Sequence, residues 1–251
     1  MIKSPEDIEK IRKAGKILAQ VAKTILAKAQ PGVRLSDLDK LAKELIEKSG
    51  GKPAFLGYQP YGAEKPYPAS ICTSLNDVIV HGTPTSYALK DGDLLKLDFG
   101  VKYQGWHADA AWTIGIGKIE AEPQKLIKIT EQALFDGIKQ AKPGHHLGDI
   151  GWAISKTVHK YGFKVVDGLT GHGVGQELHE DPSVFNEGKK GSGIELQAGM
   201  TLAIEPMVSM GSPRIVQLDD DSYATEDQSL SAHFEHTIVI TEKGPEILTL
   251  I

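Results

Sequence analysis

The sequence contains very little cysteine and no excess of positive charge. Cys72 is the one cysteine among 251 residues, so no disulfide can form within the chain, and a reducing compartment is expected. The formal net charge at pH 7 is −5, whereas a general nucleic-acid binder carries a basic excess that neutralises phosphates. We therefore expect no direct binding to DNA.

Long apolar runs are also missing. No stretch approaches the roughly 18 consecutive apolar residues that a membrane span requires. The first residues, 1–7, contain no apolar segment of the kind found in a secretory signal. Together these absences predict a cytoplasmic protein that is not embedded in a membrane.

Several familiar catalytic motifs are absent as well. The chain has no GxxxxGK[ST] phosphate loop, no CxxC pair, no GxSxG nucleophile turn and no HExxH motif. Residues 171–175 (GHGVG) are rich in glycine, but they lack the third glycine of a dinucleotide-binding loop. They also contain His172 where a phosphate would approach, so nucleotide chemistry is not predicted.

Four segments show apolar residues at helical spacing, each ended by proline or glycine. Helices are predicted over 4–30, 36–48, 123–141 and 147–160. Residues 29–52 and 141–164 align without gaps and share their helix-breaking and core positions. This self-similarity indicates two related halves, about 1–120 and 121–251, each opening with a helix pair.

Strand-like segments follow each helix pair. They cover 70–81 and 93–117 in the first half, and 201–208, 214–218 and 233–240 in the second. Runs of helices followed by runs of strands predict an α+β fold with a mostly antiparallel sheet. Because no Pro-, Gly- or Ser-rich linker interrupts the chain, we expect a single domain over residues 1–251.

Four carboxylates lie inside these apolar strands, namely Asp98, Asp109, Glu205 and Glu235. A buried carboxylate is unfavourable unless it is paired or binds a cation. One such residue would most simply be the solvent-facing acid of an alternating strand, but four of them, together with His172, favour a metal site. Carboxylates that bridge two divalent ions about 3.5–4 Å apart would explain the set. A hairpin that turns at residues 103–105 would bring Asp98 and Asp109 onto neighbouring strands.

The order Asp98, Asp109, His172, Glu205, Glu235 resembles the metal ligands of type I methionine aminopeptidases. The surrounding strings match too: NDVIVHG at 76–82, GHGVG at 171–175, IEP at 204–206 and SLSAHFEHT at 229–237. The resemblance covers nearly the whole chain. It implies the pita-bread fold, in which a curved, mostly antiparallel sheet is covered by two pseudo-symmetric helix pairs.

The resemblance also implies a reaction, namely hydrolytic removal of the initiator methionine from nascent proteins and peptides, with a preference for a small second residue. A hydroxide held between two divalent ions (Mn, Fe, Co or Zn) would attack the peptide carbonyl. Asp109 and Glu235 would bridge the ions, Asp98 would complete one of them, and His172 and Glu205 the other. The family further implies transient ribosome association, and we expect a monomer.

Other roles follow from the same resemblance. Glu205 would move the proton of the attacking water, His179 would stabilise the tetrahedral intermediate, and His81 would contact the scissile amide or protonate the leaving amine. His81 and His179 would therefore also touch the substrate. Carbonyl oxygens at Asn76, Val78 and Ser231 could hold a monovalent cation, as in relatives.

A methionine side chain needs a narrow apolar slot lined by polarizable groups. The family motif assigns this slot to Tyr67 and Cys72, with either Tyr58 or Tyr61 as the second tyrosine, because the stretch 59–66 is longer than usual. The tryptophan that the family usually carries is missing from residues 218–223. Tyr223 is the candidate that replaces it.

Two alternative functions stay open. An Xaa-Pro aminopeptidase or prolidase shares the fold and the ligands, but usually has a large extra N-terminal domain for which this chain has no room. A non-catalytic pita-bread binding module would be expected to lose metal ligands, whereas all five residue types are present. A type II methionine aminopeptidase is disfavoured because only 30 positions separate Glu205 from Glu235, too few for its helical insertion.

Overall fold

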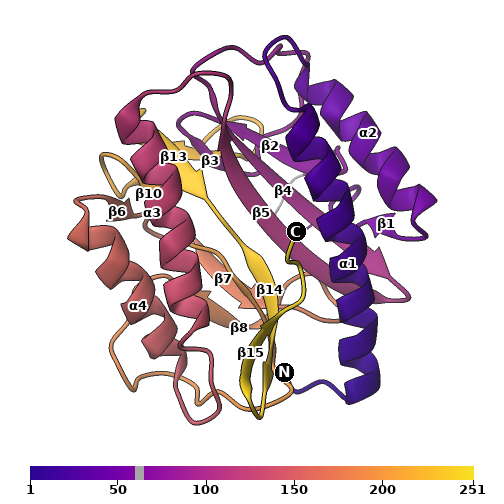
Figure 1. The fold of residues 1–251 in the computed structure, drawn as a ribbon, viewed down its shortest axis with the longest axis vertical. Coiled ribbons are helices and arrows are strands. Elements are labelled where there is room, and N and C mark those ends of the chain that lie inside the picture. The colour runs from indigo at the N-terminus through magenta and orange to yellow at the C-terminus, as the bar shows by residue number, and fades with distance from the viewer. Residues whose placement is uncertain (60–64) are drawn as a thin grey trace.

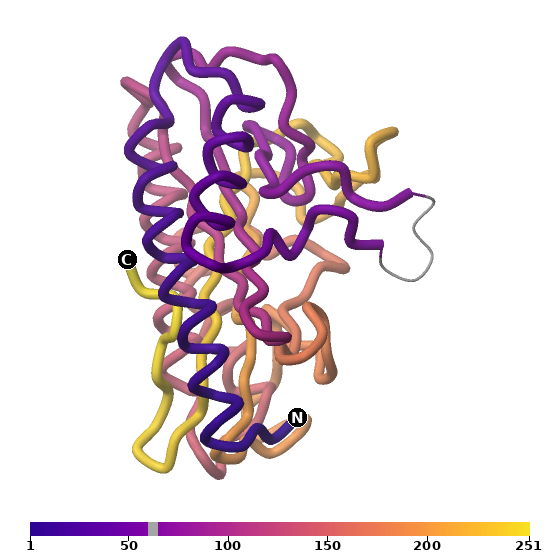
Figure 2. Tube along the Cα trace, turned by 90° about the vertical axis from the view of Figure 1, so that its right-hand side faces the viewer, coloured from indigo at the N-terminus to yellow at the C-terminus, as the bar shows by residue number. Residues whose placement is uncertain are grey.

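Helices cover one side of the strands in the computed structural model, which describes residues 1–59 and 65–251 (Figures 1 and 2). Within these residues there are four helices: α1 (Pro5–Lys28), α2 (Leu35–Lys48), α3 (Ala121–Ile138) and α4 (Leu147–Lys160). Each lies within a few residues of a helix predicted from the sequence. Across the described ranges, none of them has the length and apolarity needed to cross a bilayer.

The two helix pairs are built alike. Helices α2 and α4 both have 14 residues. Each is preceded by a residue in an isolated β-bridge, Arg34 with Ala88 and His146 with Glu195. Each is followed by a two-residue strand that begins at the equivalent lysine, Lys52 or Lys164. These parallels support our proposal that the chain consists of two pseudo-equivalent halves.

Within residues 1–59 and 65–251 the strands form four antiparallel sheets, which confirms the predicted α+β class. The first half contributes β1 (Lys52–Pro53), β2 (Ile71–Leu75), β3 (Val78–Val80), β4 (Leu94–Tyr103) and β5 (Trp106–Gly115). The second half contributes β6 (Lys164–Val165), β7 (Thr170–Gly173), β8 (Glu180–Phe185), β9 (Thr201–Ile204), β10 (Met207–Ser209), β11 (Ile215–Gln217), β12 (Tyr223–Thr225), β13 (Ser231–His233), β14 (His236–Thr241) and β15 (Gly244–Ile247).

Two sheets matter most for the site. In the first, β5 pairs with β4 along its whole length, while β2 and β1 pair with different parts of β4. The order of the second sheet is β15-β14-β9-β7-β8. The predicted hairpin is present, because Gln104 and Gly105 adopt positive φ angles of 49° and 88°, as a tight two-residue turn between twisted strands requires.

A backbone contact joins the two sheets. Ala111 of β5 and Glu235, which lies between β13 and β14, exchange two hydrogen bonds, with N–O distances of 3.3 and 2.9 Å. Each sheet is backed by an apolar core under its own helix pair, α1 and α2 over the first and α3 and α4 over the second. The junction between the halves is therefore held from both sides.

Candidate metal centre

The β4–β5 hairpin carries two carboxylates on one face. Asp98 is paired with Ala111, and Asp109 with Gly100, so the two acids are diagonal neighbours across the strands. Side chains two positions apart on a strand point to the same face, and therefore both carboxylates project the same way. This confirms the hairpin geometry expected from the sequence.

The second half supplies three more ligand candidates beside this hairpin. His172 lies in β7, Glu205 directly follows β9, and Glu235 follows β13. Strand β9 pairs with both β7 and β14, with His172 opposite Ala203 and Ile204 opposite His236. Residues that are far apart in the sequence thus meet at the junction of the two halves.

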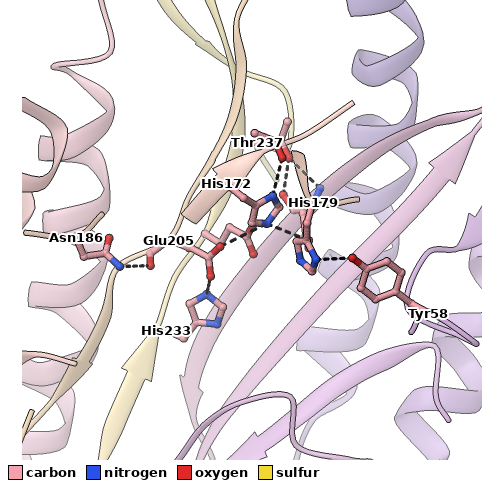
Figure 3. A network of polar contacts seen from close by, with 10 residues as sticks. Tyr58, His172, His179, Asn186, Glu205, His233 and Thr237 are labelled. Atoms are coloured by element: carbon pink, nitrogen blue, oxygen red, sulfur yellow. Dashed lines mark hydrogen bonds and ion pairs between the residues drawn. The ribbon is translucent and has the colours of Figure 1, made fainter. Parts of the chain in front are cut away.

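His172 lies close to three of the other predicted ligands. The Nε2 atom of His172 is 3.5 Å from Glu205 Oε1, 3.9 Å from Asp109 Oδ2 and 4.0 Å from Glu235 Oε1. Figure 3 shows His172 and Glu205 turned toward each other.

Among the described residues, three groups of ligand atoms lie within 4.8 Å of one another: Asp98 with Asp109 and Glu235, His172 with Glu205 and Glu235, and Asp109 with His172 and His179. Asp109 and Glu235 each belong to two groups. A carboxylate that bridges two ions must lie near the ligands of both, as a residue that belongs to two groups does.

The electrostatics of the cluster fit a bound cation. Asp98 Oδ1, Asp109 Oδ1 and Glu235 Oε1 are buried and find no hydrogen-bond partner within residues 1–59 and 65–251. An uncompensated buried charge is strongly unfavourable, and a divalent ion would remove that penalty. Carboxylate oxygens with one imidazole nitrogen form a donor set suited to Mn, Fe, Co or Zn.

Without a cation, the acids resist ionisation. Burial, reinforced by the carboxylates of Asp98 and Glu205, raises the pKa of Asp109 and of Glu235 well above its usual range. Burial also raises the pKa of Asp98 to about 6 and that of Glu205 to about 7. Ions that bind here would therefore displace protons from their ligands.

Further side chains fix the ligands in place. The hydroxyl of Thr237 accepts from the Asp109 N–H at 2.9 Å and donates to the Asp109 carbonyl at 2.8 Å. Asn186 donates to the Glu205 carbonyl at 2.9 Å, and His233 Nε2 lies 3.4 Å from Glu205 Oε2 (Figure 3). Sequence reasoning missed Thr237 and Asn186, because their partners are backbone atoms of residues distant in the chain.

The tautomer of His172 is set by its own strand. Its Nδ1 atom is 2.9 Å from the Gly173 carbonyl oxygen, which can only accept a hydrogen bond. The neutral ring therefore carries its proton on Nδ1 and directs the Nε2 lone pair toward the carboxylates. Histidines that ligate metals are commonly oriented in this way.

A cavity of about 1100 Å³ opens onto the metal centre. The predicted residues that line it are the five ligands together with Tyr58, Tyr67, Cys72, His81 and His179. Phe55 and Leu178 pack against Cys72, so part of the wall is apolar. An apolar wall beside a polar cluster is typical of a substrate pocket.

His179 and His81 face this cavity as neutral rings. Burial lowers the pKa of His179 to about 3, helped by the nearby His172, and burial lowers the pKa of His81 to about 4. The Tyr58 hydroxyl lies 2.7 Å from His179 Nδ1. His81 has a φ of 62°, a conformation that is rare outside glycine and is frequently found at functional sites.

The tyrosines of the pocket differ in their contacts. The Tyr67 hydroxyl donates to the carbonyl of Gly82 at 2.9 Å. Tyr61 lies outside the described residues. Among those described, Tyr223 does not line the cavity; its ring packs against His81, with a centroid distance of 5.9 Å.

The three residues expected at a monovalent cation do lie together. The Ser231 hydroxyl is 3.1 Å from the Asn76 carbonyl oxygen and 3.4 Å from that of Val78. However, the ammonium of Lys96 lies among these oxygens, 2.6 Å from Asn76 O. The sequence analysis did not anticipate this lysine.

Residues 9–242 match the sequence profile of metallopeptidase family M24. The chain belongs to this family. Among its M24 relatives, the methionine aminopeptidase of Clostridium perfringens is 48% identical, and the alignment covers 100% of this chain and 99% of the relative. The methionine aminopeptidase of Aquifex aeolicus is 46% identical, with 98% and 97% covered.

Solved M24 structures agree with this result. The methionine aminopeptidase of Thermotoga maritima superposes with a TM-score of 0.95 at 43% identity, covering 100% of this chain and 99% of that one. The prolidase of Pyrococcus horikoshii has a TM-score of 0.79 at 24% identity, and this chain covers 63% of its length. The expected pita-bread fold and the resemblance to methionine aminopeptidases are confirmed.

The metal-free M24 chain should lose stability as the pH rises from about 4 to about 7. In the folded chain the pKa values of Asp98 and Glu205 are about 6 and about 7, so both carboxyls keep their protons over much of this window. In the unfolded chain, carboxyls have pKa values near ~4 and have already released their protons. The folded state then binds more protons, so the free energy of unfolding falls with pH. Calorimetry in EDTA at pH 5 and pH 7 measures this.

The matched control is Glu205→Gln, which removes one of the titrating groups and should flatten the pH dependence of the melting temperature. Addition of a divalent ion should reverse the trend, because the ion binds the ionised ligands. An identical pH dependence in the variant and the parent protein would contradict the assignment.

Proposed function

We propose that this chain is a methionine aminopeptidase that removes the initiator methionine from nascent proteins and peptides, preferring a small second residue. The observation that carries the proposal is the buried cluster in which Asp109 and Glu235 each belong to two of the three ligand groups. The cluster lies at a cavity with an apolar wall, in a chain that is similar along its full length to methionine aminopeptidases.

The reaction that we propose uses two divalent ions. Asp109 and Glu235 would bridge them, Asp98 would complete one, and His172 and Glu205 the other. Such ions, when bound, make a water acidic enough to act as a nucleophile near neutral pH and polarise a peptide carbonyl. The grouping of the ligand atoms supports this assignment.

Glu205 is the proposed proton carrier. Its Oε1 atom is 3.5 Å from His172 Nε2, so the carboxylate would lie beside a water held by ions at this centre and could take and return a proton there. His233 lies beside that carboxylate, with its Nε2 atom 3.4 Å from Glu205 Oε2. The attacking water would lose its proton to Glu205, and the leaving amine would receive it.

The two neutral histidines act on the peptide. When the Tyr58 hydroxyl donates to Nδ1 of His179, the proton of the His179 ring is on Nε2, from which it stabilises negative charge on the carbonyl oxygen of the tetrahedral intermediate. His81 directly follows β3 and also lines the cavity; it would contact the scissile amide or protonate the leaving amine. Phe55, Cys72 and Leu178, with Tyr67, form the slot for the methionine side chain.

The metallopeptidase should release methionine from Met-Ala-Ser and act poorly on Met-Leu-Ser and on an Xaa-Pro peptide. Amino-acid release is measured with Mn, Fe, Co and Zn in turn, and Asp109→Ala serves as the inactive control. Preferential cleavage of the Xaa-Pro peptide would instead assign prolidase-like activity. A protein that binds no divalent ion in a calorimetric titration would be a non-catalytic binding module.

Tyr58→Phe tests the orientation of His179. Loss of one hydrogen bond of about 1 kcal/mol predicts that kcat falls by roughly fivefold. KM should change little, because the apolar ring remains. Tyr103→Phe, at the hairpin turn, is the matched control and should leave kcat unchanged. A rise in KM at constant kcat would make Tyr58 a pocket residue only.

Tyr223→Ala should raise KM for Met-peptides, because it removes the ring against which His81 packs. Tyr223→Phe keeps that ring and should retain the parent KM. Steady-state kinetics on Met-Ala-Ser separates the two variants. An unchanged KM in Tyr223→Ala would remove Tyr223 from the substrate site.

We also propose that the protein acts as a monomer in the cytoplasm and associates transiently with the ribosome, where nascent chains emerge. The similarity to bacterial methionine aminopeptidases supports this setting. The monovalent cation expected near Asn76, Val78 and Ser231 is not part of the proposal, because an ammonium group lies at that place.

A further inference from the structure

Lys96 is a fully buried lysine in the strand that carries a metal ligand. It is 1% exposed and lies on β4, two positions before Asp98. Lysine is almost never fully buried unless its charge is compensated. Because residues two apart on a strand share a face, Lys96 and Asp98 project to the same side of the sheet.

Three oxygen atoms surround the Lys96 ammonium. Its Nζ atom is 2.6 Å from Asn76 O, 3.3 Å from Ser231 O and 3.2 Å from Ser231 Oγ. An ammonium group has three N–H donors and no acceptor, so its hydrogen-bonding capacity matches these three partners. All three oxygens are uncharged.

The oxygens are themselves held rigidly. Asn76 has a φ of 53°, and its side-chain oxygen accepts from the Leu94 N–H at 2.9 Å. The Asn76 carbonyl also accepts from the Ser231 N–H at 3.0 Å, which ties the β2–β3 turn to β13. The Asn76 and Ser231 groups are therefore bonded to each other as well as to Lys96, and their oxygens converge on its Nζ atom.

We infer that the Lys96 ammonium is a built-in cation that takes the place of a monovalent metal ion at this junction. An ion bound there would need the same Asn76 and Ser231 oxygens that Lys96 engages. Two like charges a few ångströms apart in a buried site would also repel strongly. The chain therefore needs no sodium or potassium at this position.

The lysine acts as a positioning residue for the metal centre. Its hydrogen bonds hold Ser231 next to Asn76. Ser231 is the first residue of β13, and Glu235 follows that strand four positions later. Its own strand carries Asp98. Lys96 thus links the segments of Asp98 and Glu235, which belong to one ligand group.

The first experiment uses the unaltered protein. Its melting temperature is measured in EDTA with NaCl, KCl or tetramethylammonium chloride at one ionic strength. Equal values are expected, because no monovalent ion binds. A melting temperature that is higher in NaCl or KCl than in tetramethylammonium chloride would overturn the inference. Since no divalent ion is present, this result is independent of whether the peptidase function is correct.

The second experiment removes the ammonium. Lys96→Ala leaves an oxygen-lined space, so its melting temperature should be lowered in tetramethylammonium and recovered selectively by sodium or potassium. Lys96→Met fills the space with an uncharged side chain, so sodium or potassium should not restore its melting temperature. Lys102→Ala, in the same strand, should behave as the parent. Failure of any monovalent ion to restore Lys96→Ala selectively would count against a cation position.

A third measurement tests the link to the metal centre. In tetramethylammonium, Lys96→Ala should bind Mn²⁺ about 10-fold more weakly than the parent, as expected when a residue that orients ligands is lost. Sodium or potassium should restore that affinity. If Lys96→Ala binds Mn²⁺ with the affinity of the parent, Lys96 has no positioning role.

Discussion

Four carboxylates that repel one another are buried around one point, and much of the structure serves to keep them there. Each would be more stable protonated or in water, as the raised pKa values of Asp109 and Glu235 indicate. They cannot move apart, because Ala111 and Glu235 exchange backbone hydrogen bonds and Thr237 holds both backbone groups of Asp109. The free energy of folding supplied by the two cores maintains this arrangement, and either protonation or bound cations would relieve the repulsion.

The division of the chain into two halves explains how such a cluster can be rigid and still be open to a substrate. The hairpin brings Asp98 and Asp109, the second sheet brings His172 and Glu205, and Glu235 stands at the seam. Helices cover one side of the strands, so the loops that carry His81 and His179 are free to line the cavity (Figure 2). Rigid strands would thus hold the proposed ions, while the loop residues would meet the peptide.

The sequence predicted what depends on local pattern. Helix ends were readable because Pro31-Gly32 and Pro143-Gly144 stop α1 and α3, and the hairpin was readable from its turn. The meeting of Asp109 with His172 came from a family resemblance, since spacing alone carries no information about strands from different halves. Thr237 and Asn186 bind backbone atoms, so no motif reveals them. Tyr223 was placed by its position in the family motif, but its ring packs on His81, because β12 pairs with β3.

Lys96 shows why charge alone does not describe this interior. It is a buried cation two residues from Asp98, yet its three hydrogen bonds go to uncharged oxygens of Asn76 and Ser231. An ammonium paired directly with Asp98 would neutralise a ligand and weaken the attraction for a divalent ion. Held instead by carbonyl and hydroxyl oxygens, it strengthens the frame and leaves the carboxylates available. The amine is covalently attached, so it stays in place whichever monovalent ions are in solution, although burial lowers the pKa of Lys96 to about 7.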